Sequence, residues 1–130
     1  MTITYTSERD VKKQVKKLLD RHKYFWWMPP ANGYGAAGIS DIKALKAGVF
    51  IAIETKFKSN TLTANQRGFL NSIQSEDGFA FVVDEKNIGQ LERWLSLFEQ
   101  ASQLSAQQKI LDHSDGADLI DCLHALTVKI

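Results

Sequence analysis

The sequence predicts a single α/β domain, and three observations support that class. The chain has 130 residues, of which 44% are hydrophobic, so one core of ordinary size can be buried. Segments with apolar residues at helical spacing alternate with short, nearly continuous apolar runs. In order through residue 98, these segments predict the succession α-β-β-β-α-β-α, followed by one or two further helices within residues 101–130.

Composition restricts the compartment and the class of site. No uncharged apolar run approaches 18 residues, and the N-terminus lacks the order of a signal peptide, so we expect no membrane partner. A single cysteine, Cys122, excludes an intramolecular disulfide framework and a cysteine-rich zinc site. A reducing, cytoplasmic setting is therefore expected.

The charge distribution is asymmetric although the net charge is only +1. Residues 1–60 hold 11 Lys and Arg against 5 Asp and Glu, whereas residues 61–130 hold 5 against 10. A basic half indicates a surface that meets a polyanion such as nucleic acid, unless the cluster is simply a solvated face.

The first helix is expected to run from its cap at Ser7 to about His22, with Asp10 at the third helical position as a variant of the capping box. Its apolar residues fall on one arc, and its basic residues lie on the other side. That side is either a solvated face or a surface for phosphates. Glu8 lies on the apolar arc, so it needs a partner there or is stabilised by the positive end of the helix.

Three strands are expected next, over residues 24–28, 39–46 and 49–57. A glycine-rich loop over residues 32–38 separates the first two, and Lys46-Ala47-Gly48 forms a tight turn between the second and third.

Thr63 and Gln66 form a capping box that opens the next helix, which ends before Gly78. A strand over residues 79–83 follows. Asn87 and Gln90 then cap a helix that extends to about residue 98, and further helices are expected over about 105–113 and 116–128.

The strand ends bring ionisable residues together. Side chains alternate along a strand, so Phe50, Ala52, Glu54 and Lys56 share one face. A hairpin that turns near residues 46–48 pairs residues whose numbers sum to about 95, which places Asp41 opposite Glu54, within one or two residues.

Two carboxylates with a lysine nearby suit phosphodiester chemistry. Carboxylate oxygens hold Mg²⁺ or Mn²⁺, and the backbone carbonyl of Thr55 is a possible further ligand. The metal would lower the pKa of a bound water, and the Lys56 ammonium would orient that water or stabilise charge on phosphorus. The structural alternative is a buried ion-pair network, which is costly without excellent geometry.

Ser40-Asp41, twelve residues, and then Glu54-Thr55-Lys56 resemble the bipartite signature of the PD-(D/E)xK nuclease superfamily. Further segments match a narrower pattern: the helix with Glu8, Gly38-Ile39-Ser40-Asp41, Leu62-Thr63-Ala64-Asn65-Gln66 and Gly78 before the last strand. With these segments the chain resembles the VRR-NUC family and is similar to archaeal Holliday-junction resolvases. Ser40 stands where the family usually has proline.

The resemblance implies a restriction-endonuclease-like α-β-β-β-α-β core with a mixed central sheet flanked by helices. Residues 1–100 would form the nuclease domain, and residues 101–130 a C-terminal helical extension, packed on the same domain or at a dimer contact. It implies metal ligation by Asp41 and Glu54, with Lys56 as the catalytic lysine. Glu8 would be a further carboxylate that completes or orients the metal site. Gln66 would reach back to the lysine, the water or the phosphate; alternatively, it only forms the capping box with Thr63.

The function implied is a Mg²⁺- or Mn²⁺-dependent endonuclease for DNA, acting on branched, flap or Holliday-junction substrates. A homodimer, or larger partners in repair, recombination or phage replication, would suit that task. Residues expected to contact DNA are Lys12, Lys16, Tyr34, Lys43, Lys58 and Arg67.

Three further features of the sequence have competing interpretations. Residues 33–38 match G-x-G-x-x-G, but the nine residues between Gly38 and Gly48 are too few for a helical crossover. The aromatic residues 24–27 either stack on bases or, more commonly, pack on the two faces of a sheet. The three histidines show no zinc-ligand spacing.

Two other functions stay open at this point. The chain could be a nucleic-acid-binding module that keeps the fold without catalysis, or a small interaction protein whose carboxylates only pair with lysines.

Overall fold

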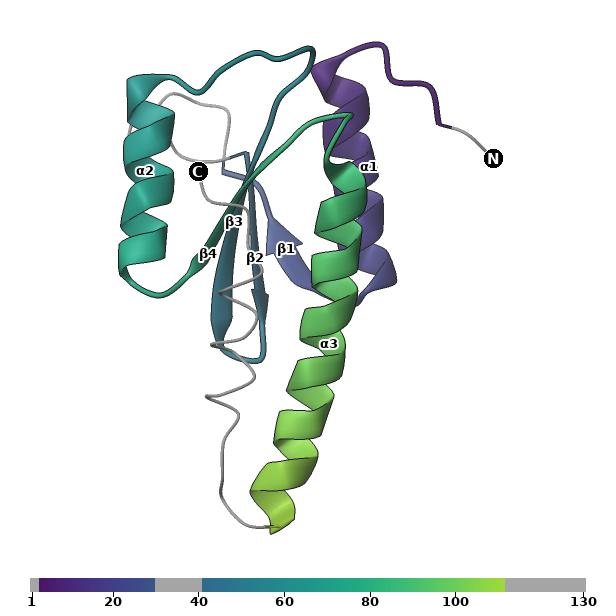
Figure 1. Cartoon of the computed structure of the whole chain (residues 1–130), viewed down its shortest axis with the longest axis vertical. Coiled ribbons are helices and arrows are strands. Elements are labelled where there is room, and N and C mark those ends of the chain that lie inside the picture. Colours follow the sequence, from purple (N-terminus) through teal and green to yellow (C-terminus); the bar gives the residue numbers. More distant parts are fainter. Residues whose placement is uncertain (1–2, 30–40, 112–130) are drawn as a thin grey trace.

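A computed structural model describes residues 3–29 and 41–111 of the chain (Figure 1). The elements are α1 (Glu8–Arg21), β1 (Phe25–Trp27), β2 (Ile42–Lys46), β3 (Val49–Thr55), α2 (Ala64–Ser75), β4 (Phe79–Val83) and α3 (Ile88–Leu111). The α/β class and the element order expected through residue 98 are confirmed. The expected helix over 116–128 and the glycine-rich loop with Tyr34 lie outside the described residues.

The four strands form one mixed sheet in the order β1-β2-β3-β4. The strands β1, β2 and β3 pair antiparallel, while β4 runs parallel to β3 after the crossover through α2. Lys46 pairs with Val49 and Ile42 with Ile53, so the hairpin has the expected sum of 95. Ala47 and Gly48 have φ of 51° and 79°, as a two-residue type I′ turn requires.

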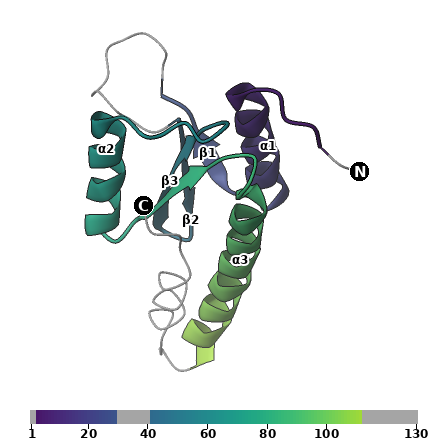
Figure 2. The same ribbon diagram turned by 45° about the horizontal axis from the view of Figure 1, so that its top comes forward.

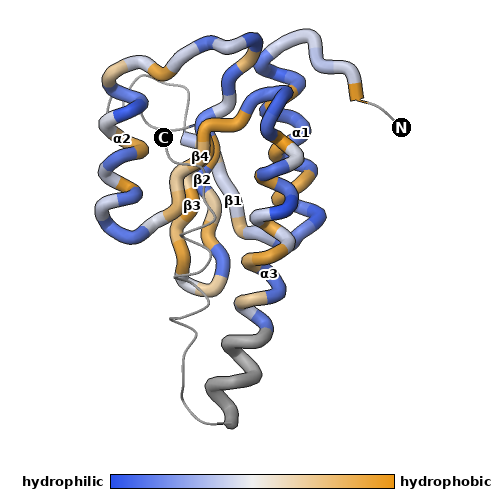
Figure 3. The backbone as a smooth tube through the Cα atoms, viewed as in Figure 1, coloured by the Kyte–Doolittle hydropathy of each residue, from blue (hydrophilic) through white to orange (hydrophobic). Residues whose placement is uncertain are grey.

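Helices cover the two faces of the sheet unequally. In Figures 1 and 2, α2 lies on one face, while α1 and α3 lie on the other. The main core packs Val11, Val15 and Leu19 of α1 against the sheet and against α3. A smaller cluster beneath α2 is centred on Ala52, Leu70 and Ala80. Figure 3 shows the hydrophobic strands β3 and β4 between helices of mixed hydropathy, as this layered packing requires.

The start of α1 differs from the expected capping box. Ser7 occupies the N-cap position, but its side chain makes no capping hydrogen bond. The Asp10 carboxylate instead accepts from the backbone N of Thr6 at 2.8 Å and from its hydroxyl at 2.7 Å. Asp10 therefore bonds to Thr6, the residue before the N-cap, and not to Ser7. The expected Ser7–Asp10 capping box is wrong, although the helix begins where expected.

The start of α2 is the expected capping box. The backbone N of Thr63 donates to Gln66 Oε1 at 2.9 Å, and the backbone N of Gln66 donates to Thr63 Oγ1 at 3.1 Å. Both halves of the box are therefore formed.

Helix α3 is longer than expected. It runs without interruption to Leu111, so the separate helix predicted to begin at about residue 105 is wrong. Residues 90–111 contain neither glycine nor proline, so nothing in the backbone chemistry stops the helix at residue 98. The expected side-chain cap at Asn87 is wrong, because the side-chain oxygen of Asn87 accepts from the backbone N of Asp84. Its backbone carbonyl accepts from the N–H groups of Gln90 and Leu91. Within the described residues, no helix has both the length and the apolar character needed to cross a bilayer.

Candidate active site at the ends of β2 and β3

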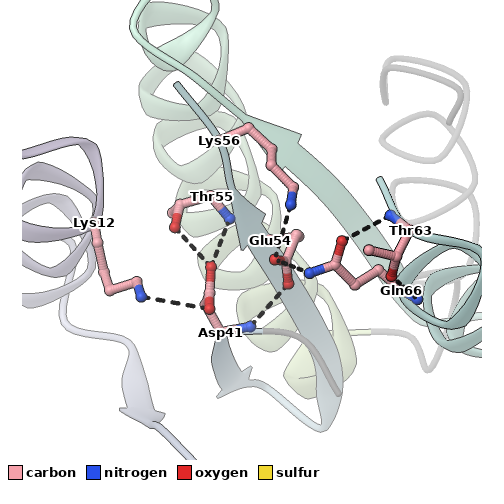
Figure 4. Close-up of polar contacts among 7 residues, drawn as sticks. All are labelled: Lys12, Asp41, Glu54, Thr55, Lys56, Thr63 and Gln66. Carbon is pink, nitrogen blue, oxygen red and sulfur yellow. Dashed lines mark hydrogen bonds and ion pairs between the residues drawn. The ribbon is translucent and has the colours of Figure 1, made fainter. Parts of the chain in front are cut away.

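The candidate site lies where β2 begins and β3 ends. Both strands are shorter than expected, so Asp41 directly precedes β2 and Lys56 directly follows β3. Figure 4 shows the side chains that meet there, from α1, the two strands and the N-terminus of α2.

Asp41 lies opposite Glu54, as the hairpin register predicts. The backbone N of Asp41 donates to Glu54 Oε2 at 3.1 Å. Asp41 Oδ2 accepts from the backbone N and the hydroxyl of Thr55, at 3.0 and 2.7 Å, and its Oδ1 lies 3.4 Å from Lys12 Nζ. The Asp41 carboxylate is thus held between β3 and α1.

Glu54 is a carboxylate buried in the sheet. Its exposed fraction is only 2%. Gln66 Nε2 donates to Glu54 Oε1 at 2.8 Å, and Lys56 Nζ lies 3.9 Å from the same oxygen. The carboxylate therefore faces α2, on the side of the sheet opposite to the side chain of Thr55.

Burial is the largest cause of an unusual pKa at Glu54. Burial and, second, the charge of Asp41 raise the pKa of this carboxyl, which is about 7 in the folded protein against an ordinary value of 4.5. The Asp41 N–H and the Lys56 ammonium oppose that rise, and Glu8 adds a smaller upward contribution. A cation bound at Glu54 would stabilise the ionised carboxylate and lower this pKa.

Gln66 forms the predicted capping box and, with the same amide, contacts Glu54, a partner that was not predicted. Its Oε1 completes the capping box with Thr63, and its Nε2 donates to Glu54. The side chain reaches the carboxylate rather than Lys56. Helix α2 is therefore fastened to the site through its first turn.

Two roles were missed by the sequence analysis. Thr55 was expected to offer a backbone carbonyl, but its N–H and hydroxyl hold Asp41. Lys12 was expected to guide phosphates, and it is ion-paired to Asp41. Strand alternation could have shown that Thr55 faces α1, because it is the neighbour of Glu54.

Glu8 does not complete a three-carboxylate cluster. In the part of the chain that the structure describes, no group of three or more His, Cys, Asp and Glu side chains is arranged to hold a metal ion. Glu8 acts on Glu54 only through its charge. The residues that could hold a divalent cation are Asp41 and Glu54, whose hard oxygen donors are of the type that Mg²⁺ and Mn²⁺ prefer.

Three other basic residues expected to contact DNA, Lys16, Lys43 and Arg67, lie on α1, β2 and α2. Lys16 Nζ lies 5.9 Å above the ring of Trp26, and Lys43 Nζ lies 5.6 Å from the ring of Phe69. Burial lowers the pKa of Lys43, against the opposing effect of the charges of Asp41 and Glu54. The side chain of Arg67 is exposed on α2.

Lys58, also expected to contact DNA, contacts Glu85 and Phe57 rather than the carboxylates of the candidate site. Its backbone N donates to the Glu85 carboxylate at 3.1 Å, and its Nζ lies 5.4 Å from the ring of Phe57. Its side chain is exposed just beyond β3.

No family model matches the sequence, and no curated protein matches it as a relative.

Proposed function

We propose that this protein is a Mg²⁺- or Mn²⁺-dependent endonuclease that hydrolyses phosphodiester bonds in DNA. The observation that carries the proposal is the meeting of Asp41, Glu54 and Lys56 at the ends of two adjacent strands, around a buried carboxylate of raised pKa. Burying ionisable groups together at the ends of two strands lowers the stability of the fold, and such clusters are typical of catalytic sites.

The fold is compatible with this proposal. A mixed sheet in which β4 follows β3 in parallel, with α2 between them, fits the restriction-endonuclease-like core that the resemblance implies. The VRR-NUC type, with residues 1–100 as the nuclease domain and a C-terminal extension, is part of the same proposal.

The donors fit a divalent cation by their chemistry, since both are hard carboxylate oxygens. In the structure, however, the Asp41 carboxylate turns toward Thr55 and α1, whereas that of Glu54 faces α2, so the Asp41 side chain would turn toward Glu54 when a cation binds. Asp41 and Glu54 would hold it, and when bound it would polarise the phosphodiester and lower the pKa of a water. Lys12 is ion-paired with Asp41 in the structure. When a cation binds Asp41, the Lys12 ammonium would leave this carboxylate and pair with a DNA phosphate instead. This exchange would place a phosphate beside the two carboxylates.

Lys56 is the proposed catalytic lysine. Its ammonium is mostly buried, 3.9 Å from the Glu54 carboxylate, so it is held near the reacting phosphate with little freedom. There it would orient the attacking water or stabilise the charge that develops on the phosphoryl oxygens. Gln66 positions Glu54 from the side of α2.

The substrate proposed is branched or flapped DNA, cut by a homodimer. A single site cuts one strand, so symmetric junctions require two copies. The cellular context would be repair, recombination or phage replication.

A cleavage panel tests the proposal. Junction, flap, single-stranded and plain duplex DNA are incubated with Mg²⁺ or Mn²⁺, beside Lys56→Ala and the control Lys17→Ala, which changes an exposed lysine of α1 away from the site. We expect wild-type cleavage that EDTA abolishes, a loss of about 100-fold or more in Lys56→Ala, and no loss in Lys17→Ala. Equal cleavage in EDTA would refute the metal mechanism.

One observation favours a second candidate, a DNA-binding module without catalysis. Both Asp41 oxygens are already engaged, by Thr55 and by Lys12. For such a module, the same panel would give DNA binding with no cleavage in either metal.

A further inference from the structure

Part of the sheet face that carries Glu54 is left uncovered by α2. The helix packs on β3 and β4, whereas β1 and β2 present Phe25, Trp27 and Leu45 on the same face. Phe25 is 66% exposed and Leu45 is 38% exposed. We call the two rings, Phe25 and Trp27, the open aromatic face, and Leu45 lies beside them.

The rings of this face form a row. The centroids of Phe25 and Trp27 lie 5.4 Å apart with planes at 35°, and Trp27 contacts Phe50 edge-on at 6.0 Å. Neighbouring rings thus hold Trp27 in place while Phe25 stays open to solvent. A ring so exposed on a small domain indicates a surface that binds something flat and apolar.

The row leads directly to the candidate site. Trp27 pairs with Lys43, and Lys43 pairs with Ala52, so all three share one face and lie in one line across the strands. Glu54 lies two residues beyond Ala52 on that face. With strands about 4.8 Å apart and a rise of about 3.3 Å per residue, Trp27 and Glu54 are separated by about 12 Å.

Lys43 supplies the charge between the rings and the carboxylates. Its Nζ lies against the ring of Phe69, at the boundary between α2 and the open aromatic face. The charges of Asp41 and Glu54 also act on Lys43, which places it electrostatically beside the site. A cation between stacked rings and a phosphate site is the arrangement that single-stranded nucleic acid requires.

We propose that the open aromatic face stacks unpaired bases of the DNA strand whose phosphate lies at Glu54 and Lys56. This inference rests on the proposed function and narrows its substrate to DNA with a single-stranded segment beside the bond that is cut. Paired bases in a duplex are stacked on each other and do not present their faces to Phe25. Unpaired bases present a flat apolar surface of the size of these rings, whatever their sequence.

Binding in EDTA tests the stacking without relying on cleavage. Fluorescence anisotropy of labelled oligothymidine and of a duplex of equal length is measured with the full chain. Phe25→Leu removes the ring but keeps apolar bulk, and Phe25→Trp keeps a ring. Leu45→Ala is the control, because it changes an exposed aliphatic residue beside the face that takes no part in stacking. We expect Phe25→Leu to weaken binding of the single strand about ten-fold. Duplex binding should change less than about two-fold, and Phe25→Trp and Leu45→Ala should retain affinity for the single strand.

Two results would overturn the inference. Equal loss of single-strand affinity in Phe25→Leu and Leu45→Ala would show a general apolar contact without stacking. Sedimentation that shows a dimer dissociated by Phe25→Leu, with unchanged oligothymidine binding, would assign the face to a second copy of the chain. Because Phe25 is mostly exposed, Phe25→Leu is expected to fold, and its thermal unfolding is recorded as a check.

A cleavage arm separates this inference from the function on which it rests. With Mg²⁺, flap cleavage relative to plain duplex should fall in Phe25→Leu and persist in Phe25→Trp. A wild-type protein that binds oligothymidine through Phe25 but cleaves no DNA would refute the nuclease and leave the stacking surface standing.

Discussion

The side-chain amide of Gln66 joins the first turn of α2 to the buried carboxylate of Glu54. Its Nε2 donates to Glu54 Oε1 at 2.8 Å, while its Oε1 accepts from the backbone N of Thr63 at 2.9 Å. Only a side chain with both a donor and an acceptor at its end can make these two bonds together. The position of the helix and the orientation of the carboxylate are therefore coupled.

Gln66→Glu separates these two bonds. The new carboxylate can still accept from Thr63, but it offers no donor to Glu54 and places a second negative charge beside it. We expect the free energy of unfolding to fall by about 2 kcal/mol at pH 8, as for the loss of a hydrogen bond to a charged group. Urea unfolding in EDTA measures this change.

Thr63→Ala is the matched control for Gln66→Glu. It removes the cap acceptor for the Gln66 backbone N, at about 1 kcal/mol, and leaves the bond to Glu54 in place. We expect DNA cleavage to fall about ten-fold or more in Gln66→Glu and to stay unchanged in Thr63→Ala. Equal cleavage by both variants would show that Gln66 only caps α2 and does not position Glu54 for catalysis.

The stability of the metal-free protein should fall as the pH rises toward 8. The pKa of Glu54 is about 7 in the folded state, against 4.5 as its ordinary value, so the folded protein binds the proton more tightly than the unfolded chain. The resulting stabilisation is fully present below pH 4.5 and is lost as the pH rises through 7. The difference corresponds to about 3 kcal/mol in total.

Glu54→Gln isolates that effect, because it keeps the shape of the side chain and removes its titration. Unfolding of both proteins is followed in EDTA from pH 5 to 8.5. The stability of Glu54→Gln relative to wild type should increase across this range. A constant difference would show that Glu54 does not titrate there.

Much of the site could be predicted because it depends on local rules. The turn at Ala47-Gly48 fixes the hairpin register, and that register alone places Asp41 opposite Glu54. Strand alternation assigns Glu54 to one face. The three-residue spacing of Thr63 and Gln66 identifies the start of α2.

The remaining features depend on tertiary packing that no local pattern carries. Asp41 precedes β2, so strand alternation does not determine the direction of its side chain. Its carboxylate turns toward Thr55 and α1. The position of Glu8 depends on how α1 crosses the sheet. The continuation of α3 past residue 98 was missed because the apolar spacing weakens there, although the backbone continues as a helix.

Lys12→Ala should have opposite effects on metal and on DNA. The Lys12 ammonium lies 3.4 Å from Asp41 Oδ1, where it competes with a divalent cation for that oxygen. Removing it should tighten Mn²⁺ binding about three-fold and weaken duplex DNA binding at low salt, since one phosphate contact is lost. Calorimetric titration with Mn²⁺ and anisotropy with DNA measure the two effects, with Lys13→Ala as the control on the same helix. Parallel changes in both affinities would contradict the exchange of Asp41 for phosphate.

Gly78 lies close to both the last turn of α2 and β3, and substitution there should disturb the packing between them. A Cβ at Gly78 would lie 2.6 Å from Ile73 Cγ2 and 3.2 Å from the Phe50 carbonyl oxygen. The branched side chain and the backbone cannot both move aside, so Gly78→Ala should lower the free energy of unfolding by about 2 kcal/mol. Gly68→Ala is the matched control: a Cβ there meets nothing within 4 Å in the interior of α2, so it should raise stability by up to about 1 kcal/mol. Urea unfolding of the two variants should therefore give shifts of opposite sign, and a stable Gly78→Ala protein would show that α2 does not pack on β3 this closely.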